Sequence, residues 1–191
     1  MTRPEVMRIV YILWMSIFAI WAIASLWVKR TTESSSEASS RIAVWAVTIS
    51  WWIILRPGTW QGVWGLRFVP EGAPGLYAGL ALTIIGLAFA LWSRFYIGKN
   101  WDGMVVLKED HQLMRRGPYG IVRHPIYSGF MLATLGTAMV QGEAWRLVGV
   151  ALIVIAWGYK ARVEEKFLME RFGPQYEQYR REVKALVPAV W

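Results

Sequence analysis

Long uncharged stretches alternate with polar segments along this chain. No charged residue occurs in residues 9–28 or in residues 72–93. About 20 apolar residues in a helix are enough to cross the hydrocarbon layer of a membrane. The two stretches therefore predict two membrane-spanning helices.

Three shorter uncharged stretches, residues 42–55, 125–142 and 147–159, predict three further spans. Long basic side chains at their ends can reach the membrane interface and so extend such runs. The last two stretches are joined only by residues 143–146, which predicts a tight helical hairpin. The whole pattern predicts an all-α, polytopic integral membrane protein with about five transmembrane helices and with its termini on opposite sides.

The chain is predicted to form a single membrane domain over residues 1–191. Residues 1–97 contain three spans, with a polar loop at residues 31–40, and residues 98–191 contain the hairpin and a C-terminal helix. The first span has some features of a secretory signal, because Arg3 and Arg8 precede it. It is longer than the usual signal core and further membrane segments follow it, so we expect it to be retained.

Small residues recur at helical spacing in the third and fourth spans. They are Gly75 and Gly79 in the third span and Gly129, Ala133 and Thr137 in the fourth. Small residues let membrane helices approach closely. We therefore expect these two helices to pack against each other.

Basic residues gather on both sides of the predicted hairpin. Of the 21 Lys and Arg residues, five lie in residues 99–123 and seven in residues 160–184, and the net charge is +8. Cytoplasmic loops carry an excess of Lys and Arg, which places both clusters on the cytoplasmic side, although Arg3 and Arg8 oppose this orientation. The expected location is the plasma (inner) membrane of a prokaryote. A basic surface beside a membrane favours anionic lipid over nucleic acid as its partner.

The sequence contains no Cys and only two His residues, His111 and His124. The lack of Cys excludes disulfides, thiol nucleophiles and cysteine metal sites. Zinc sites use three or four Cys, His or carboxylate ligands, so two His residues argue against an imidazole-built site. We predict no metal.

The segment around Arg123, His124 and Pro125 carries the first candidate chemistry. Proline disfavours helical geometry in the preceding residue and suits the first turn of a helix, so His124 should be extended and the fourth helix should begin at Pro125. The free N–H groups of such a helix start attract an anion. Arg123 adds a charge that can bind a carboxylate, and Gly129 permits a close approach. Taken singly, these residues are also explained by lipid binding, helix capping and interfacial anchoring.

Glu164 and Glu165 extend the fifth helix just beyond its predicted span. Adjacent helical residues point about 100° apart, so at most one of them should face a pocket squarely. The other is expected to meet solvent or a basic neighbour. Composition alone favours a solvated helical turn with Lys160, Arg162 and Lys166.

The second half of the chain resembles the integral-membrane methyltransferases related to isoprenylcysteine carboxyl methyltransferase, which have phospholipid methyltransferases as relatives. The matching positions are Gly117, Pro118, Tyr119, Val122, Arg123, His124, Pro125, Tyr127, Gly129, Arg162, Glu164, Glu165, Phe172, Gly173, Tyr176, Tyr179, Val187 and Pro188. A lone Arg-His-Pro would be a weak signal. The order of these motifs and their position beside membrane spans make the resemblance specific.

The resemblance implies an S-adenosylmethionine enzyme whose cofactor lies between the Arg-His-Pro region and the Glu-Glu helix, on the cytoplasmic face. The cofactor-binding residues that it implies are Gly117, Tyr119, Val122, Arg123, His124, Pro125, Tyr127, Gly129, Arg162, Glu164 and Glu165. Tyr119 and Tyr127 are expected to place aromatic faces near the adenine or the cationic sulfonium. A small lipophilic methyl acceptor is expected to enter from the bilayer.

The acceptor chemistry stays open between two classes. A carboxylate is already nucleophilic and needs an Arg to orient it, for which Arg94 and Arg123 are candidates. An amine must lose a proton, so that Glu164, Glu165 or His124 would act as a base. We predict carboxyl O-methylation with Arg94, Arg123 and Glu165 as catalytic residues, and phospholipid amine N-methylation is the alternative.

Two departures from the longer isoprenylcysteine enzymes argue against a prenylated protein as the substrate. The chain has only three spans before its second half, and Ile126 stands where those enzymes usually carry Ser. Other classes of function are an NADPH-dependent membrane reductase and a non-catalytic membrane protein that binds anionic lipid or a partner. The Arg-His-Pro and Glu-Glu motifs favour the methyltransferase, and the sequence contains no glycine-rich dinucleotide fingerprint of the soluble type.

Overall fold

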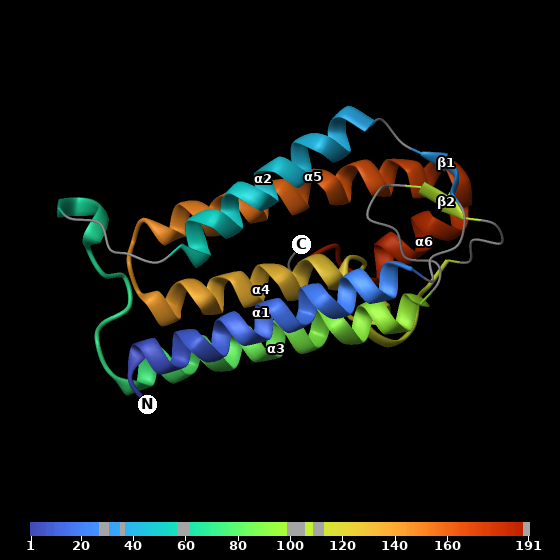
Figure 1. Cartoon of the computed structure of the whole chain (residues 1–191). Coiled ribbons are helices and arrows are strands. Elements are labelled where there is room, and N and C mark those ends of the chain that lie inside the picture. The colour runs from blue at the N-terminus through green and yellow to red at the C-terminus, as the bar shows by residue number, and fades with distance from the viewer. Residues whose placement is uncertain (27–30, 35–36, 57–61, 99–105, 109–112, 189–191) are drawn as a thin grey trace.

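A computed structural model describes residues 1–26, 31–34, 37–56, 62–98, 106–108 and 113–188 (Figure 1). Within these ranges six α-helices are present: α1 (Arg3–Ser25), α2 (Glu37–Leu55), α3 (Ala73–Ile97), α4 (Pro125–Gln141), α5 (Arg146–Phe172) and α6 (Pro174–Glu182). Two 3-10 turns, η1 (Gly62–Gly65) and η3 (Gly117–Gly120), precede α3 and α4. Strands β1 (Thr31–Ser34) and β2 (Val106–Lys108) form a two-stranded antiparallel sheet.

The five long helices lie side by side and alternate in direction along the bundle (Figure 1). One end of the bundle, which we call the α6 end, carries α6 and the β1–β2 sheet. Helices α1, α3 and α5 finish at this end, and α2 and α4 begin there. The start of α4 and the polar part of α5 therefore meet at the same end of the molecule.

Each of the five predicted spans is helical in the described residues. Helix α1 over Arg3–Ala24 and helix α3 over Ala73–Ile97 are long and apolar enough to cross a membrane, and α2 contains a shorter apolar helix, Trp45–Leu55. The count of five membrane crossings remains a prediction. The end of the first predicted span, residues 27–28, lies outside the described residues.

The predicted all-α architecture is confirmed, but the prediction of a polar loop at residues 31–40 was wrong. Residues 31–34 form strand β1, which pairs Thr31 with Lys108 and Ser34 with Val106, and α2 already begins at Glu37. β-Branched residues such as Thr and Val favour extended strands. The pairing joins two polar segments that lie far apart in the sequence, so it leaves no local sequence signal.

Helices α3 and α4 pack closely through glycines, as the small-residue spacing predicted. A Cβ on Gly86 would lie 2.5 Å from the carbonyl oxygen of Gly129, and a Cβ on Gly129 would lie 2.6 Å from the carbonyl oxygen of Gly86. Gly79 and Gly136 approach each other in the same way. Distances this short allow no side chain, so the backbones themselves are in contact. Gly75 lies outside this contact and meets Val69 instead.

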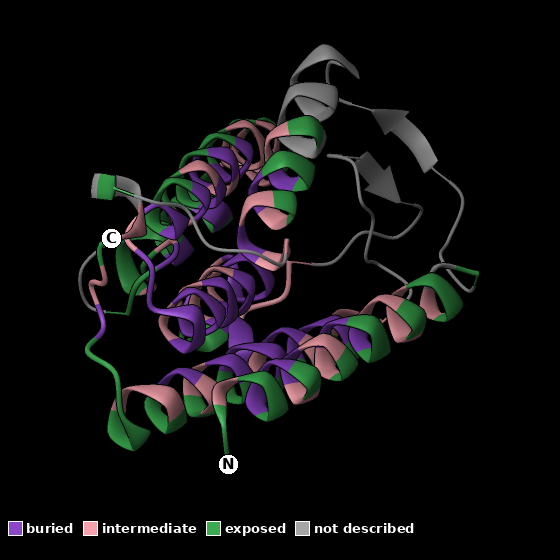
Figure 2. Ribbon diagram, turned by 60° about the vertical axis from the view of Figure 1, so that its left-hand side comes forward, coloured by how far each residue is buried: buried purple, intermediate pink, exposed green. Residues whose placement is uncertain are grey.

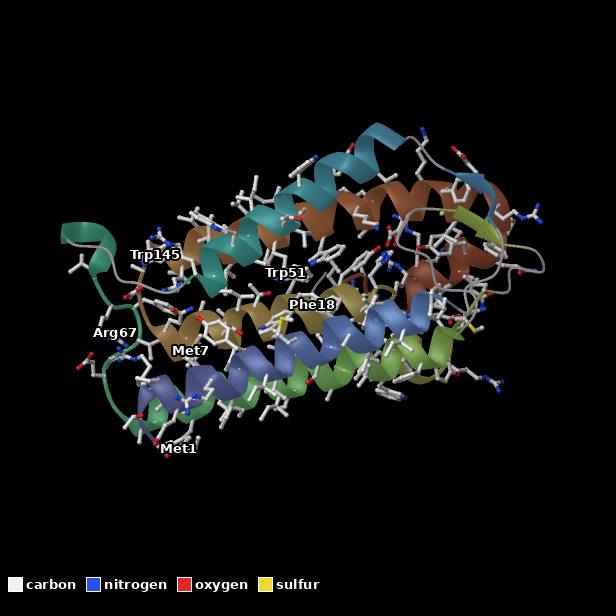
Figure 3. The ribbon with its side chains drawn as sticks, in the orientation of Figure 1. Met1, Met7, Phe18, Trp51, Arg67 and Trp145 are labelled. Atoms are coloured by element: carbon white, nitrogen blue, oxygen red, sulfur yellow. The ribbon has the colours of Figure 1, made fainter. Side chains whose placement is uncertain are left out.

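Helix α4 forms the middle of the core, where buried residues concentrate, while the outer helices carry exposed residues on their outward faces (Figure 2). Phe18 on α1 and Trp51 on α2 point toward each other with ring centroids 4.7 Å apart (Figure 3). These rings belong to a larger set that we call the aromatic cluster: Trp14, Phe18, Trp21, Trp51, Phe130 and Trp157.

The predicted hairpin between α4 and α5 is confirmed at the end of the bundle opposite α6. Gly142 ends α4 in the left-handed conformation (φ 78°). Arg146 begins α5 and lies 3.2 Å from a carboxylate oxygen of Glu143. Its guanidinium also donates to the carbonyls of Ile53 and Ile54 at the end of α2. These hydrogen bonds connect the hairpin to the end of α2, and α2 packs along α5.

Candidate active site

His124 lies at the centre of a cluster of charged side chains at the α6 end. Its side chain is 5% exposed. Nδ1 lies 3.2 Å from Oε2 of Glu164, and Nε2 lies 3.3 Å from Oε1 of Glu165. Both ring nitrogens therefore face carboxylates on α5, and the imidazole joins the start of α4 to that helix.

The local sequence places His124 just before the helix. Its backbone is non-helical (φ −121°, ψ 62°), and α4 begins at Pro125 as predicted. The N–H groups of the two residues before Pro125 are not free, and the binding of an anion at this helix start stays a prediction. The N–H of Arg123 donates to the carbonyl of Lys184 (2.8 Å), and that of His124 donates to the carbonyl of Ala185 (3.0 Å). Residues 184–186, which we call the C-terminal strap, therefore occupy this position.

Arg123 binds a carboxylate that the protein itself supplies. Its Nε and Nη2 donate to Oε1 of Glu165 at 2.8 Å and 2.5 Å. Nη1 donates to the carbonyls of Arg180 and Val183, which belong to the end of α6 and the residue after it. The two side chains are 8% and 13% exposed, so this is a largely buried ion pair. Arg123 thereby connects the end of α6 with the residues before α4 and with Glu165 on α5.

Both glutamates contact His124, which corrects the interpretation of this part of α5 as a solvated turn. Glu164 accepts a hydrogen bond from the hydroxyl of Tyr127 in addition to its contact with His124. Glu165 meets His124, Arg123 and also Arg180, whose Nε lies 3.5 Å away. The two nitrogens of the imidazole point in different directions. They can therefore reach two adjacent helical positions that diverge by about 100°.

The electrostatics of the cluster favour its fully charged form. Burial opposes the charged form of His124, but hydrogen bonds and charges from Glu164 and Glu165 outweigh burial and raise its pKa. Burial likewise opposes ionisation of Glu165, but hydrogen bonds from His124 and Arg123 lower its pKa to about 2. The pKa of Glu164 is also lowered, because the same histidine outweighs burial. At neutral pH both carboxylates are ionised.

Aromatic rings continue from His124 toward the middle of the bundle. The rings of His124 and Tyr127 lie 5.6 Å apart and nearly parallel (3°), and those of Tyr127 and Trp157 lie 4.4 Å apart at 12°. Nζ of Lys160 lies 5.9 Å from the Tyr127 ring and 5.8 Å from the Trp157 ring. Sequence reasoning did not assign Lys160 and Trp157 to the site. Their spacing of four and seven residues before Glu164, on one helical face, was the available signal.

A cleft of about 530 Å³ adjoins the cluster between α5, α6 and the C-terminal strap. Its lining residues are Arg123, Gly158, Ala161, Arg162, Glu165, Glu177, Arg180, Arg181, Lys184, Ala185 and Leu186. Glu165 is one of the residues that line the cleft, and Glu164 is not. The two adjacent carboxylates therefore lie in different surroundings. Arg162, a predicted cofactor residue, is also in the lining.

Other predicted site residues lie around the cluster. Arg94, at the end of α3, donates to the carbonyls of Gly98 and Ala24 and so joins α3 to α1. Tyr119 in η3 is buried, and its carbonyl accepts a hydrogen bond from the Tyr179 hydroxyl at 2.5 Å. The catalytic role of Arg94 and the cofactor contact of Tyr119 remain predictions.

Three further predicted cofactor residues have packing contacts. Gly117 has φ 60°, and a Cβ there would lie 2.6 Å from the Tyr96 ring. Val122 is 1% exposed. Gly129 lies against Gly86 of α3, which explains its lack of a side chain through helix packing. Residues 99–101 and 109–112 of the polar insertion, His111 included, lie outside the described residues. Among the residues that the structure describes, no group of three potential metal ligands is present.

The chain is similar in sequence to a known protein family. The profile of the phospholipid methyltransferase family matches residues 75–175, from the start of α3 into α6. The chain belongs to the phospholipid methyltransferase family. The matched residues include Arg123, His124, Glu164 and Glu165. The cluster of charged side chains around His124 therefore lies within the segment that matches the family.

Individual relatives agree with the resemblance noted in the sequence. The chain is 29% identical over 143 residues to protein-S-isoprenylcysteine O-methyltransferase B of Arabidopsis thaliana, covering 72% of this chain and 66% of the relative. It is 35% identical over 98 residues to the protein-S-isoprenylcysteine O-methyltransferase of Schizosaccharomyces pombe, covering 49% of this chain and 41% of the relative. The chain thus spans less than two thirds of the length of these relatives.

A solved structure shares the fold. The eukaryotic intramembrane Ras methyltransferase, an isoprenylcysteine carboxyl methyltransferase, superposes with a TM-score of 0.53 at 20% sequence identity. The match covers 82% of this chain and 54% of that structure. Most of the helical bundle described above is therefore common to both proteins.

Proposed function

We propose that this protein is an S-adenosylmethionine-dependent methyltransferase that acts on a lipophilic acceptor at the membrane interface, by carboxyl O-methylation. One observation carries the proposal. The family-matched segment brings Arg123, His124 and Glu165 together beside a cleft of about 530 Å³. Small-molecule sites are clefts of about this size with a few converging polar groups.

The lining of the cleft fits the chemical groups of S-adenosylmethionine. Glu165 and Glu177 offer carboxylates for an ammonium or for ribose hydroxyls, and Arg162 and Lys184 offer cations for a carboxylate. Gly158, Ala161, Ala185 and Leu186 supply small or apolar surface for the adenine. The cofactor supplies a methyl group on a cationic sulfonium.

The residues of the site act by positioning. Methyl transfer requires the nucleophile and the methyl group to be aligned in a dry site, rather than a strong acid or base. The ion pairs of Arg123 and His124 with the two glutamates hold the end of α5 against the start of α4. Tyr127 adds a hydrogen bond to Glu164. These contacts fix the wall of the cleft.

We propose that five helices cross the plasma membrane of a prokaryote, with the α6 end in the cytoplasm. Large apolar side chains are exposed along several helices, which is expected of a surface that contacts lipid. Examples are Ile12 and Met15 on α1, Trp45 and Trp52 on α2, Ile84 and Ile85 on α3, and Val154 and Ile155 on α5. The basic residues that surround the cleft support the cytoplasmic placement.

Calorimetric titration of the detergent-purified protein with S-adenosylmethionine tests the cofactor assignment. The wild type should bind it saturably, and Glu165→Gln should weaken binding at least tenfold, because a charge-assisted contact contributes about 1.5–3 kcal/mol. Glu170→Gln is the matched control, since Glu170 is exposed on the same helix. Binding of NADPH without S-adenosylmethionine binding by the folded wild type would contradict the proposal and favour a reductase.

The family profile names phospholipid methyltransferases, so an amine acceptor is the second candidate. A labelled-methyl assay with prenylated cysteine and with phosphatidylethanolamine distinguishes the two. Esters are cleaved by base and methylated amines are stable to it. A product that is only base-stable would favour the amine acceptor.

A further inference from the structure

A second cavity, of about 350 Å³, lies at the end of the bundle opposite α6. It is enclosed by the first residues of α1 and α3, the segment before α3 and the end of α4. Figure 3 shows Met1 and Arg67, which both line the cavity, at this end of the molecule. Helix α3 runs from the cavity to the α6 end over 25 residues, which is about 37 Å at 1.5 Å per residue. The cavity is therefore separate from the cleft beside His124.

Two arginines line this cavity from different parts of the chain. Arg3 lies in the first turn of α1, and Arg67 lies in the segment before α3. Arg67 is held in place, because its Nε donates to the carbonyl of Val69 (3.1 Å) and its Nη1 to the carbonyl of Gln141 (3.2 Å). Its Nη2 has no hydrogen-bond acceptor among the described residues. Among the same residues, Arg3 donates only to Glu71, at 3.3 Å. Both guanidinium groups therefore keep donors for a ligand.

The carboxylate that the two arginines share is a weak partner. Oε1 of Glu71 lies 3.3 Å from Nη2 of Arg3 and 3.8 Å from Nη1 of Arg67. The Glu71 side chain is 73% exposed, so water screens both contacts and they contribute little. Glu143, at the same end of the bundle, is different, because its carboxylate is buried and lies 3.2 Å from Arg146. Glu71 can therefore move aside for a ligand, whereas the charge of Glu143 is already balanced.

The charges that line the cavity are positive in sum. Arg3 and Arg67 carry two positive charges and Glu71 carries one negative charge. The amino group of Met1 donates to the Tyr77 hydroxyl (3.0 Å) and adds positive charge. Helix α3 begins here without a side-chain cap, so its first N–H groups add partial positive charge. This balance suits an anion whose oxygens can bind two guanidinium groups at once, as those of a phosphate can.

The position of the cavity indicates a phosphate that belongs to a lipid. The two helices that are long and apolar enough to cross a membrane, Arg3–Ala24 and Ala73–Ile97, both begin at the cavity. The edge of the hydrocarbon layer, where lipid headgroups begin, is expected at such helix starts. Buried Val69 and Val140 give the cavity apolar surface as well. Further along α3, Ile84 is exposed on the outer face, where an acyl chain can lie against it.

We propose that this cavity binds the phosphate of an anionic phospholipid through Arg3 and Arg67, with the acyl chains along the outer face of α3. The excess of positive charge favours a lipid with one net negative charge over a lipid that also carries an ammonium group. A lipid bound here contacts α1, α3 and the end of α4 at the membrane surface opposite the cofactor cleft. The proposal does not depend on which cofactor or methyl acceptor the α6 end binds.

Calorimetric titration of the full chain in dodecylmaltoside tests the site with three probes: dioctanoyl phosphatidylglycerol, dioctanoyl phosphatidylcholine and inorganic phosphate. The wild type should bind phosphatidylglycerol saturably and at least about tenfold more tightly than either other probe. Arg67→Met and Arg3→Met should each weaken its binding about tenfold, since each removes a charge-assisted hydrogen bond. Glu71→Gln should strengthen binding severalfold, because it removes the competing carboxylate. Arg8→Met, at an exposed position of α1, is the matched control and should bind as the wild type does.

The opposite effects expected for the arginine and glutamate variants separate a binding role from a structural one, because a damaged fold would weaken binding in all three. If Arg67→Met does not fold, Arg3→Met carries the test, since Arg3 has the fewer contacts. Equal binding of the two lipids would overturn the proposal. Inorganic phosphate that binds as tightly as phosphatidylglycerol would overturn the assignment to a lipid. Unchanged affinity in both arginine variants would also overturn the proposal, because the lipid would then bind elsewhere on the protein.

Discussion

Replacing Arg123 with Met tests whether the buried ion pair holds the α6 end together. The variant keeps much of the side-chain volume and removes the charge that faces Glu165. Removing one partner of a buried pair is destabilising by about 3–5 kcal/mol, because the other charge is left uncompensated. His124 and Arg180 also contact Glu165, at 3.3 Å and 3.5 Å, so they compensate part of that charge. We expect a loss of about 3 kcal/mol in the free energy of unfolding.

The assay is a double-mutant cycle in mixed dodecylmaltoside and dodecyl sulfate micelles, followed by tryptophan fluorescence. Glu165→Gln and the double variant complete the cycle, and Arg171→Met, at an exposed position of α5, is the matched control. If the pair is direct, the double variant should be about 1–3 kcal/mol more stable than the sum of the single effects predicts. A loss below about 0.5 kcal/mol for Arg123→Met, or additive effects, would refute the reasoning.

Three further predictions concern the same contacts. Gly86→Ala should destabilise the protein by about 1–3 kcal/mol in the same unfolding assay, since its Cβ would lie 2.5 Å from the backbone of α4; wild-type stability would contradict the close packing. Tyr127→Phe removes one hydrogen bond to Glu164 and should lower stability by about 1 kcal/mol without changing the helical circular dichroism. The raised pKa of His124 stabilises the protein fully below pH 6.5, and this contribution is lost as the pH rises from 6.5 through the raised value. Unfolding midpoints should therefore fall over that range in the wild type, and His124→Asn should lack this component.

The helices of the fold could be predicted from the sequence because their signals are local. Uncharged runs located five helices, and Pro125 fixed the start of α4. Glycine spacing predicted the α3–α4 contact, in which Gly79 and Gly129 take part. The β1–β2 pairing could not be predicted, because its partners lie more than 70 residues apart and neither segment is apolar enough to stand out.

The sequence predicted which residues form the candidate site, but it did not predict most of the contacts between them. The order of the motifs predicted that Arg123, His124 and the two glutamates lie close together. In the structure these side chains are in contact. The sequence could not show that the imidazole bridges both carboxylates, because that depends on the rotation of α5 relative to α4. It also could not show that the backbone of residues 184–186 covers the start of α4, since carbonyl groups carry no sequence signal. Lys160 was interpreted as part of a solvated turn, because a lysine next to charged residues usually is.

The long helices include two closely packed pairs, which we call the two halves: α3 with α4, and α2 with α5. The glycine contacts join α3 and α4 backbone to backbone, so there are no side chains between them that could repack. Helix α2 packs along α5, where Ser50 donates to the carbonyl of Gly149. His124 belongs to the first half and both glutamates to the second, so their ion pairs cross the boundary. Ligand entry and release should therefore change the separation of the halves rather than the shape of either, and spin labels on α3 and α5 would record that opening.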